Sequence, residues 1–254
     1  MHEIPPPDYQ PQGDELRERV ILITGAGDGI GRAVALACGK HGATVILAGK
    51  TLRKLESVYD EIEAAGGPTP AIYPINLEGA TEMDYDNLGE TLEREFGRLD
   101  GLLHNAAKLG VLSRIDDYDM ETWYQILQVN LNGPMMLTRA CLPLLRKSED
   151  ASVVFTSDQY GRRGRAYWGA YGVSKAAIEG FMQILAHETE GTSPIRVNSF
   201  DPGPTRTQLR LAAFPAEDHG QLKPPEDLVP AYLWLLGPAS RGVTGQALSY
   251  RAAD

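Results

Sequence analysis

A tyrosine and a lysine stand four residues apart, at Tyr171 and Lys175. In a helix, residues at this spacing lie on one face, about one turn from each other. A free phenol has a pKa of about 10, which is too high for efficient acid–base work at neutral pH. A nearby ammonium favours the phenolate and lowers that pKa, so the pair can exchange a proton with an alcohol or a ketone. Taken alone, this spacing is more typical of an ordinary helix face, so its meaning depends on the rest of the chain.

A glycine-rich turn near the N-terminus gives the second chemical signal. The string Thr24 to Gly31 directly follows an apolar run, 20–24, and opens a segment with helical spacing, 30–40. Glycines there allow a tight turn and a close approach of the backbone to a pyrophosphate, and the amides at the helix start favour the phosphate charge. The strand before and the helix after are the context that such a motif requires. The residues expected to hold a dinucleotide at this turn are Gly25, Gly27, Asp28, Gly29, Ile30 and Gly31.

Short apolar runs alternate with helical segments along the chain. The runs are 20–24, 44–48, 71–75, 101–104, 152–156 and 195–200, with 247–249 as a candidate seventh. Continuous apolar strands between helices imply a parallel sheet that is covered on both faces. We therefore predict an α/β fold with one Rossmann-type, doubly wound parallel sheet of six or seven strands over 18–254, after an extended arm at 1–17. The polar, proline-rich stretch between Pro202 and Pro225 predicts a functional lid at about 204–223.

Composition and charge argue against several classes of function. The chain has 34 acidic and 24 basic residues, a net charge of −10, which disfavours a nucleic-acid or anionic membrane partner. No apolar run reaches the roughly 18 residues of a membrane helix, and the N-terminal residues lack the pattern of a secretory signal. Five scattered histidines show no ligand spacing, so no metal site is expected. Cys38 and Cys141 are expected to be core thiols of a cytoplasmic protein.

The motifs, taken in order, resemble those of the short-chain dehydrogenase/reductase family over nearly all of 18–250. The T-G-x-x-x-G-x-G turn is followed by Asn105-Ala106-Ala107, Asn130, Tyr171-x-x-x-Lys175 and Pro202-Gly203. The strings GRRGRAYWGAYGVSK and DPGPTRTQLR are similar to those of the bacterial YciK-type oxidoreductases. The resemblance implies an enzyme that interconverts an alcohol and a carbonyl of a small molecule by hydride transfer with a nicotinamide cofactor. Relatives pair through long helices that correspond to 120–145 and 168–190, which implies a homodimer or homotetramer.

The resemblance also assigns roles within the site. Tyr171 is the expected acid/base, Lys175 also binds the nicotinamide ribose, and Asn130 matches an asparagine that links the lysine to water. Asn105 is expected chiefly to tie its strand to the neighbouring strand. Further cofactor contacts implied by the resemblance are Asn76 and Leu77 beside the adenine, Ala106 and Ala107 after the fourth strand, and Pro202, Gly203, Thr205 and Thr207 around the carboxamide and pyrophosphate. The family usually has Asn-Asn-Ala-Gly where this chain has His104 to Ala107.

The end of the second strand bears on the choice of cofactor. Folds that prefer NAD place an acidic residue there for the ribose 2′-hydroxyl, whereas this chain has Lys50 and, soon after, Arg53. Cations at this point suit the additional phosphate of NADP, so NADP(H) is predicted over NAD(H). The alternative is that both are solvated residues at a helix start. Asp28 is a mild counter-signal, because family members that take NADP often have a basic residue in the turn.

The family pattern breaks at Asp158. A serine normally stands at this position, thirteen residues before the tyrosine, and donates a hydrogen bond to the substrate carbonyl. An ionised carboxylate cannot donate, and its charge would raise the pKa of Tyr171. Three interpretations stay open: a protonated Asp158, a replacement donor such as Ser157 or Gln159, or an activity that is lost or changed. The last would make the chain a nucleotide-binding sensor or scaffold.

The sequence does not identify the substrate. Arg162, Arg163 and Arg165 stand beside the expected mouth of the site. They would attract an anionic substrate, and solvated loop arginines are an equally good interpretation.

Overall fold

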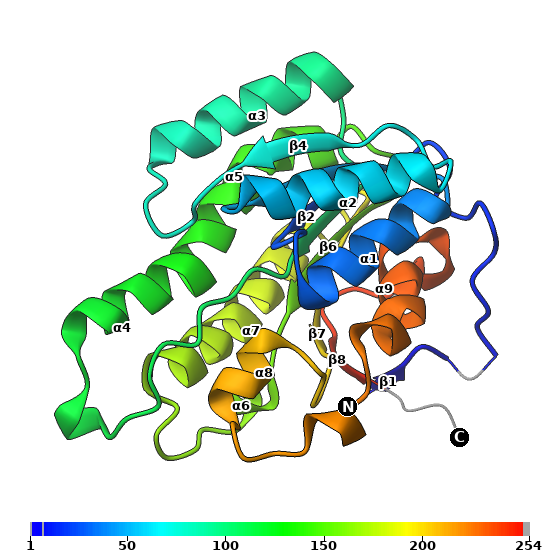
Figure 1. Ribbon diagram of the computed structural model, residues 1–254. Coiled ribbons are helices and arrows are strands. Elements are labelled where there is room, and N and C mark those ends of the chain that lie inside the picture. The colour runs from blue at the N-terminus through cyan, green and yellow to red at the C-terminus, as the bar shows by residue number, and fades with distance from the viewer. Residues whose placement is uncertain (1, 7, 251–254) are drawn as a thin grey trace.

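The computed structural model describes residues 2–6 and 8–250, so residues 1, 7 and 251–254 of the expected arm and domain lie outside the described residues. In this part of the chain, eight strands form one parallel sheet in the order β1-β8-β7-β6-β5-β2-β3-β4 (Figure 1). The strands are β1 (His2–Ile4), β2 (Val20–Thr24), β3 (Thr44–Gly49), β4 (Ala71–Pro74), β5 (Gly101–His104), β6 (Ala151–Thr156), β7 (Ile195–Asp201) and β8 (Ala247–Tyr250). The helices are α1 (Gly29–Lys40), α2 (Leu52–Ala64), α3 (Glu82–Phe96), α4 (Met120–Leu127), α5 (Gly133–Leu145), α6 (Gln159–Arg162), α7 (Gly169–Thr189), α8 (Gln208–Ala213) and α9 (Val229–Leu236).

Different helices cover the two faces of the sheet. Because successive side chains of a strand point to opposite faces, Ile21 and Ile23 of β2 pack into one apolar cluster and Leu22 into the other. The first cluster includes residues of α1, α2 and α9, and the second includes residues of α3, α5 and α7. Figure 1 shows these two helix layers on either side of the sheet. The predicted doubly wound α/β fold is confirmed.

The N-terminal arm contributes a strand that the sequence did not predict. In β1, Glu3 and Ile4 pair in parallel with Ser249 and Tyr250 of β8, which makes β1 the eighth strand at the edge of the sheet. A run of three residues is too short to show the alternation by which a strand is recognised. The side chain of Ile4 is 3% exposed, so its burial against the body accompanies the pairing.

The segment expected as one helix over 120–145 consists of three parts. Between α4 and α5 lies a π-helical turn, Gln128–Asn132, which inserts one wider turn into an otherwise continuous helical path. Turns of this kind occur often at functional sites. The turn contains Asn130, whose side chain is buried and points toward α7, where it contacts Ser174.

The strand order sets the position of a ligand site. The chain runs from β2 to β3 on one side and places β5 on the other, so the order reverses between β2 and β5. In open α/β sheets, ligands bind outside the carboxyl ends of the strands at such a reversal. The glycine turn that follows Thr24 lies there.

The predicted lid, 204–223, lies outside the sheet and contains α8. A parallel bridge between Thr205 and Lys223 joins the two ends of this segment. Phe214, just after α8, lies with its ring centroid 5.8 Å from that of Trp168, so the segment packs against an aromatic cluster that includes Tyr171.

Both cysteines lie in the core, as predicted. Cys38 is part of the apolar cluster on one face of the sheet, Cys141 is part of the cluster on the other face, and both are free thiols. Among the described residues, no helix is long and apolar enough to cross a membrane, and no group of histidine, cysteine or acidic side chains is placed to hold a metal ion.

Candidate active site

A cleft with a volume of about 560 Å³ crosses the carboxyl ends of the central strands. It brings together most of the residues that the sequence singled out. Those that line it are Gly25, Gly27, Asp28, Gly29, Ile30, Lys50, Asn76, Leu77, Asn105, Ala106, Ala107, Asp158, Tyr171, Lys175, Pro202, Gly203, Thr205 and Thr207. The glycine turn and Tyr171 thus line the same cleft.

Three of the predicted residues lie outside the lining of the cleft. Gly31 packs beneath the glycine turn, where a Cβ atom would come within 2.2 Å of the Gly25 carbonyl oxygen, so this position requires glycine. Asn130 lies behind the catalytic residues. Arg53 is exposed on α2, and the neighbouring Lys54 lines the cleft instead.

The glycine turn is held in a conformation that favours glycine. Gly25 and Gly29 have φ values of 66° and 50°, in the left-handed region. Asp28 caps α1 by accepting a hydrogen bond of 2.7 Å from the Gly29 amide, and its carboxylate also pairs with Lys54. The hydrogen bond from Lys54 holds the pKa of Asp28 below its ordinary value. Lys54 therefore balances the negative charge of Asp28 in the turn. For this reason Asp28 argues less strongly against NADP as the cofactor.

Asn105 ties β5 to β2, as predicted. Its backbone amide donates to the Thr24 hydroxyl at 2.9 Å, and its side-chain amide donates to the Thr24 carbonyl at 3.3 Å. Among the described residues, the non-glycine positions with positive φ are Glu18 and Tyr167, so Ala107 fits its backbone without strain. His104 belongs to the core: burial lowers its pKa to about 3, and its ring stacks on Phe155.

The Tyr171 hydroxyl donates a hydrogen bond of 3.0 Å to Oδ2 of Asp158. The other carboxylate oxygen, Oδ1, accepts from the Tyr160 amide at 3.0 Å, so Asp158 also caps the short helix α6. Tyr171 is 3% exposed. Its pKa is raised well above the ordinary value, first because burial disfavours the phenolate and then because of the charge and hydrogen bond of Asp158. In this arrangement the phenol stays protonated at neutral pH.

Lys175 is buried beside this pair. Its Nζ atom donates to the Thr156 carbonyl at 2.7 Å and lies 5.7 Å from the centroid of the Tyr171 ring. Burial lowers the pKa of Lys175, while the carboxylates of Asp158, Asp201 and Glu179 oppose that shift. The ammonium is thus close enough to stabilise a phenolate when the phenol gives up its proton.

Asn130 fixes the loop in front of the catalytic helix. Its Oδ1 accepts from the Lys108 amide at 2.8 Å, and its Nδ2 donates to the Lys108 carbonyl at 2.9 Å and to the Ser174 hydroxyl at 3.0 Å. It thereby joins the segment after β5 to α7, one residue before Lys175.

Ser157 does not replace the missing serine. Its hydroxyl is buried and donates to Oε1 of Glu179, which also accepts from Arg162 at 3.0 Å. The second oxygen of Glu179 accepts from the Ser199 hydroxyl at 2.6 Å. Ser157 therefore belongs to a buried polar network behind the site. Gln159, which lines the cleft, is the remaining replacement donor among those that the sequence suggested.

Comparison with known proteins identifies the family. A family model described as short chain dehydrogenase matches residues 19–218. The uncharacterized oxidoreductase YciK of Escherichia coli K12 is 46% identical over 237 residues, which are 93% of this chain and 93% of that protein. The chain belongs to the short-chain dehydrogenase/reductase family. It is an oxidoreductase of that family, as the motifs predicted.

Solved structures agree with this assignment. A short-chain dehydrogenase from Pseudomonas syringae is 51% identical and superimposes with a TM-score of 0.94, over 96% of this chain and 99% of that one. A short-chain dehydrogenase from Escherichia coli CFT073, solved as a complex with NADPH, is 45% identical with a TM-score of 0.92, over 95% of this chain and 100% of that one.

Three functional groups of this short-chain dehydrogenase escaped the sequence analysis. Asp201 ends β7, lines the cleft and accepts a hydrogen bond from the Gly203 amide at 2.8 Å. Burial raises its pKa. The signal for Asp201 was its place directly before Pro202-Gly203. For Glu179 the signal was its spacing four residues after Lys175, on the same helix face. Lys54 gave no signal that separates it from Arg53.

Replacing Asp158 by serine is predicted to raise the rate of carbonyl reduction. Serine restores a donor to the carbonyl oxygen and removes a charge that competes for the Tyr171 proton. Loss of one such donor typically costs on the order of 100-fold, so we expect a gain of about 10- to 100-fold in kcat for Asp158→Ser. The measurement is NADPH oxidation with any carbonyl compound that the wild type reduces.

Ser157→Ala is the matched control, because it removes a neighbouring hydroxyl whose proton is already donated to Glu179. It should give no gain. Loss of activity in both Asp158→Ser and Asp158→Asn, with NADPH binding retained, would show instead that the carboxylate takes a productive part in the reaction.

Proposed function

We propose that the protein uses NADPH to reduce a carbonyl group of a small molecule to an alcohol. The observation that carries this proposal is the buried Tyr171 hydroxyl, which lies beside Lys175 in the cleft that the glycine turn also lines. Burial and Asp158 raise the pKa of this phenol, which favours its protonated form. A protonated phenol is ready to donate to a carbonyl oxygen, whereas alcohol oxidation would need the phenolate. The direction proposed is therefore reduction.

The cleft fits a dinucleotide. The left-handed backbone at Gly25 and Gly29 forms the turn into α1, and the first residues of this helix, Gly29 and Ile30, line the cleft, where a helix N-terminus favours a pyrophosphate. Asn76 and Leu77, expected beside the adenine, and Thr205, expected near the carboxamide and pyrophosphate, line the same cleft. The NADPH complex of the Escherichia coli CFT073 relative supports the same cofactor here.

The chain's own residues account for the proton. When bound, the nicotinamide supplies the hydride, and thus both electrons, to the carbonyl carbon. Tyr171 donates its hydroxyl proton to the carbonyl oxygen, so the C=O double bond becomes a C–OH single bond. The ammonium of Lys175 stabilises the resulting phenolate, which takes a proton back from solvent. To donate in this way, Tyr171 must exchange its hydrogen bond to Asp158 for one to the substrate.

Tyr171→Phe is predicted to abolish most of the reductase activity while NADPH binding persists. General acid catalysis contributes typically 100- to 10,000-fold, and we expect a loss of kcat in that range. The assay follows NADPH oxidation over a panel of ketones and aldehydes. Tyr59→Phe is the control, because the Tyr59 hydroxyl contacts Glu63 on the exposed side of α2. Equal activity in Tyr171→Phe and wild type, or NADPH binding without turnover of any carbonyl, would refute the proposal.

We further propose that NADP(H) binds more tightly than NAD(H). Lys50 and Lys54 both line the cleft at the end of β3, where a 2′-phosphate would lie. Charge-assisted hydrogen bonds to such a group are worth about 1.5–3 kcal/mol, so Lys50→Asp should weaken NADPH binding by about 10- to 100-fold and leave NADH binding nearly unchanged. Fluorescence titration with both cofactors measures this.

Lys40→Asp, with the same charge change in the last turn of α1, is the control for nonspecific electrostatics and should leave both affinities as they are. Arg53→Gln should have a smaller effect than Lys50→Asp, because Arg53 does not line the cleft. Equal affinity of the wild type for NADPH and NADH would contradict the preference.

A homodimer or homotetramer is proposed from an exposed stripe on α7. Val173, Ala176, Gly180 and Ile184 share one face of this helix and are exposed. A Cβ atom at Gly180 would meet nothing within 4 Å, so the helix surface is open there. Small residues at such a place permit the close approach of a second helix. The stripe lies on one of the two long helices through which relatives pair.

Gly180→Arg is therefore expected to produce monomers without unfolding the chain, since the added side chain meets nothing within the subunit. Light scattering at micromolar concentration measures the mass, and the temperature of unfolding reports the fold. Gly13→Arg, at a turn that is also open, is the control for the added charge. A monomeric wild type would remove the basis of the proposal.

The proposed location is the cytoplasm. Both cysteines are buried, free thiols on opposite faces of the sheet, an arrangement typical of proteins from reducing compartments.

A further inference from the structure

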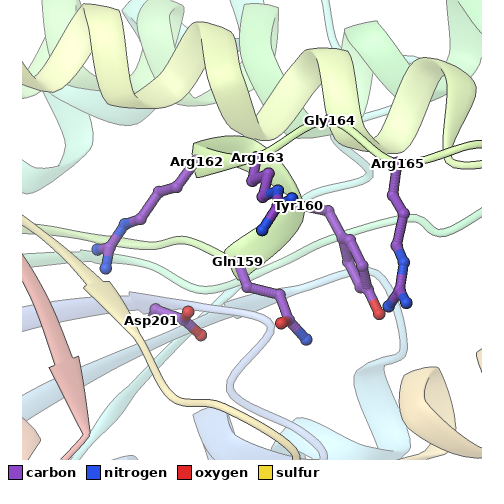
Figure 2. Close-up of a pocket in the computed structure, with 7 residues that line it drawn as sticks. All are labelled: Gln159, Tyr160, Arg162, Arg163, Gly164, Arg165 and Asp201. Carbon is purple, nitrogen blue, oxygen red and sulfur yellow. The ribbon is translucent and has the colours of Figure 1, made fainter.

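A second cavity adjoins the cofactor cleft at its catalytic end (Figure 2). It has a volume of about 510 Å³, and Gln159 and Asp201 line both spaces. Its charged lining otherwise consists of three arginines: Arg162, Arg163 and Arg165. A molecule whose carbonyl lies at Tyr171 can therefore extend into a space where cations outnumber acids.

Arg162 is a structural part of the wall. Its Nε lies 3.0 Å from Oε1 of Glu179, and its other two nitrogens donate to the Ser249 hydroxyl at 2.8 Å and to the Leu248 carbonyl at 2.7 Å. These contacts join α6 to α7 and to β8. The charge of Arg162 is balanced by Glu179, so this arginine does not supply the excess positive charge of the cavity.

Arg163 and Arg165 differ from Arg162 in this respect. Within residues 8–250, neither guanidinium forms a hydrogen bond or an ion pair, and both side chains are exposed. Their backbones are nonetheless held: the Arg163 amide donates to the Gln159 carbonyl at 2.9 Å, and the Arg165 carbonyl accepts from the Trp168 amide at 3.3 Å. Figure 2 shows both side chains extending to the same side of the segment as Gln159.

The aromatic pair beneath the arginines fixes the segment. The ring of Tyr160 stacks on that of Trp168 at a centroid distance of 3.5 Å, and both rings are buried. Gly161 packs so closely on α7 that a Cβ atom would come within 2.6 Å of the Lys175 backbone. The position of the two arginines is thus coupled to that of the catalytic helix.

One carboxylate, that of Asp201, lines the cavity together with these cations. Its Oδ1 accepts a hydrogen bond of 2.8 Å from the Gly203 amide. The two guanidinium groups without a partner in the described part of the chain therefore outnumber the acid of the lining. Guanidinium groups bind carboxylates and phosphates through paired hydrogen bonds.

We propose that the substrate is a carbonyl compound with a carboxylate or phosphate group, and that Arg163 and Arg165 bind this anion while the carbonyl lies at Tyr171. The proposal rests on the proposed reductase function and names the substrate class of the same site.

The test compares matched charged and uncharged carbonyl compounds with NADPH. The probes are a chain-length series of oxo acids, each with its amide, and dihydroxyacetone phosphate with dihydroxyacetone; the two sets separate carboxylate from phosphate. The wild type should favour the charged member of at least one pair by about 10- to 100-fold in kcat/KM. The double variant Arg163→Gln/Arg165→Gln should bring that ratio close to one. Arg94→Gln, an exposed arginine on α3, is the control and should keep the wild-type ratio.

Equilibrium binding separates this proposal from the proposed function. Calorimetric titration of the NADPH-loaded protein with the same probes should give tighter binding of the charged member, and the double variant should lose that difference while its NADPH affinity reports an intact cleft. This result without turnover would uphold the anion site and refute the reductase. Equal binding of charged and uncharged members, no binding of either, or a ratio that the double variant does not change would overturn the anion site.

Discussion

The hydrogen bond from the Tyr171 hydroxyl to Asp158 is the interaction on which the chemistry of this site depends. It ties Tyr171, the proposed acid, to a carboxylate at the position where the family usually has a serine donor. The phenol is buried and faces a negative charge, so its pKa is raised and its proton is retained. That favours proton donation to a carbonyl over proton removal from an alcohol. The hydrogen bond also directs the phenolic proton of Tyr171 toward Asp158. A substrate carbonyl must therefore compete with Asp158 for that proton.

Packing beneath the site maintains this arrangement. Asp158 caps α6, and α6 contacts the catalytic helix so closely at Gly161 that no larger residue fits. Glu179 of the same helix accepts hydrogen bonds from Ser157 and Arg162, which come from the segment that follows β6. If the carboxylate of Asp158 turned away from Tyr171, it would also lose the hydrogen bond by which it caps α6.

Much of the fold was predictable because its signals are long and local. The run Val20–Thr24 followed by the glycine turn predicts a buried strand and a helix start, and the structure places both there. β1 was not predicted because a strand of three residues is defined by its pairing with β8. The local sequence around β1 does not reveal that pairing. The π-helical turn at Asn130 was not predicted because one wider turn between two helical segments has no residue pattern of its own.

The site was predictable where a motif fixes one residue, and less so where packing chooses between neighbours. Tyr171, Lys175 and Asp158 lie together as the motif implies. Lys54 rather than Arg53 lines the cleft because the register of α2 against β3 turns one of two adjacent cations inward. The sequence alone allows Ser157 to act as a donor to the substrate. In the structure, the Ser157 hydroxyl instead donates to Glu179, a residue of α7 that the local sequence around Ser157 does not reveal.

The carboxylate of Asp158 adds to burial in raising the pKa of the Tyr171 phenol. The direct measurement is the pH titration of the Tyr171 ring carbon by NMR in protein labelled at tyrosine Cζ, assigned by comparison with Tyr171→Phe, in wild type and Asp158→Asn. Removing the negative charge lowers the pKa of the phenol, so the variant should titrate at lower pH than the wild type. Titration of both proteins at the same pH, or of the wild type at the lower pH, would contradict the claim.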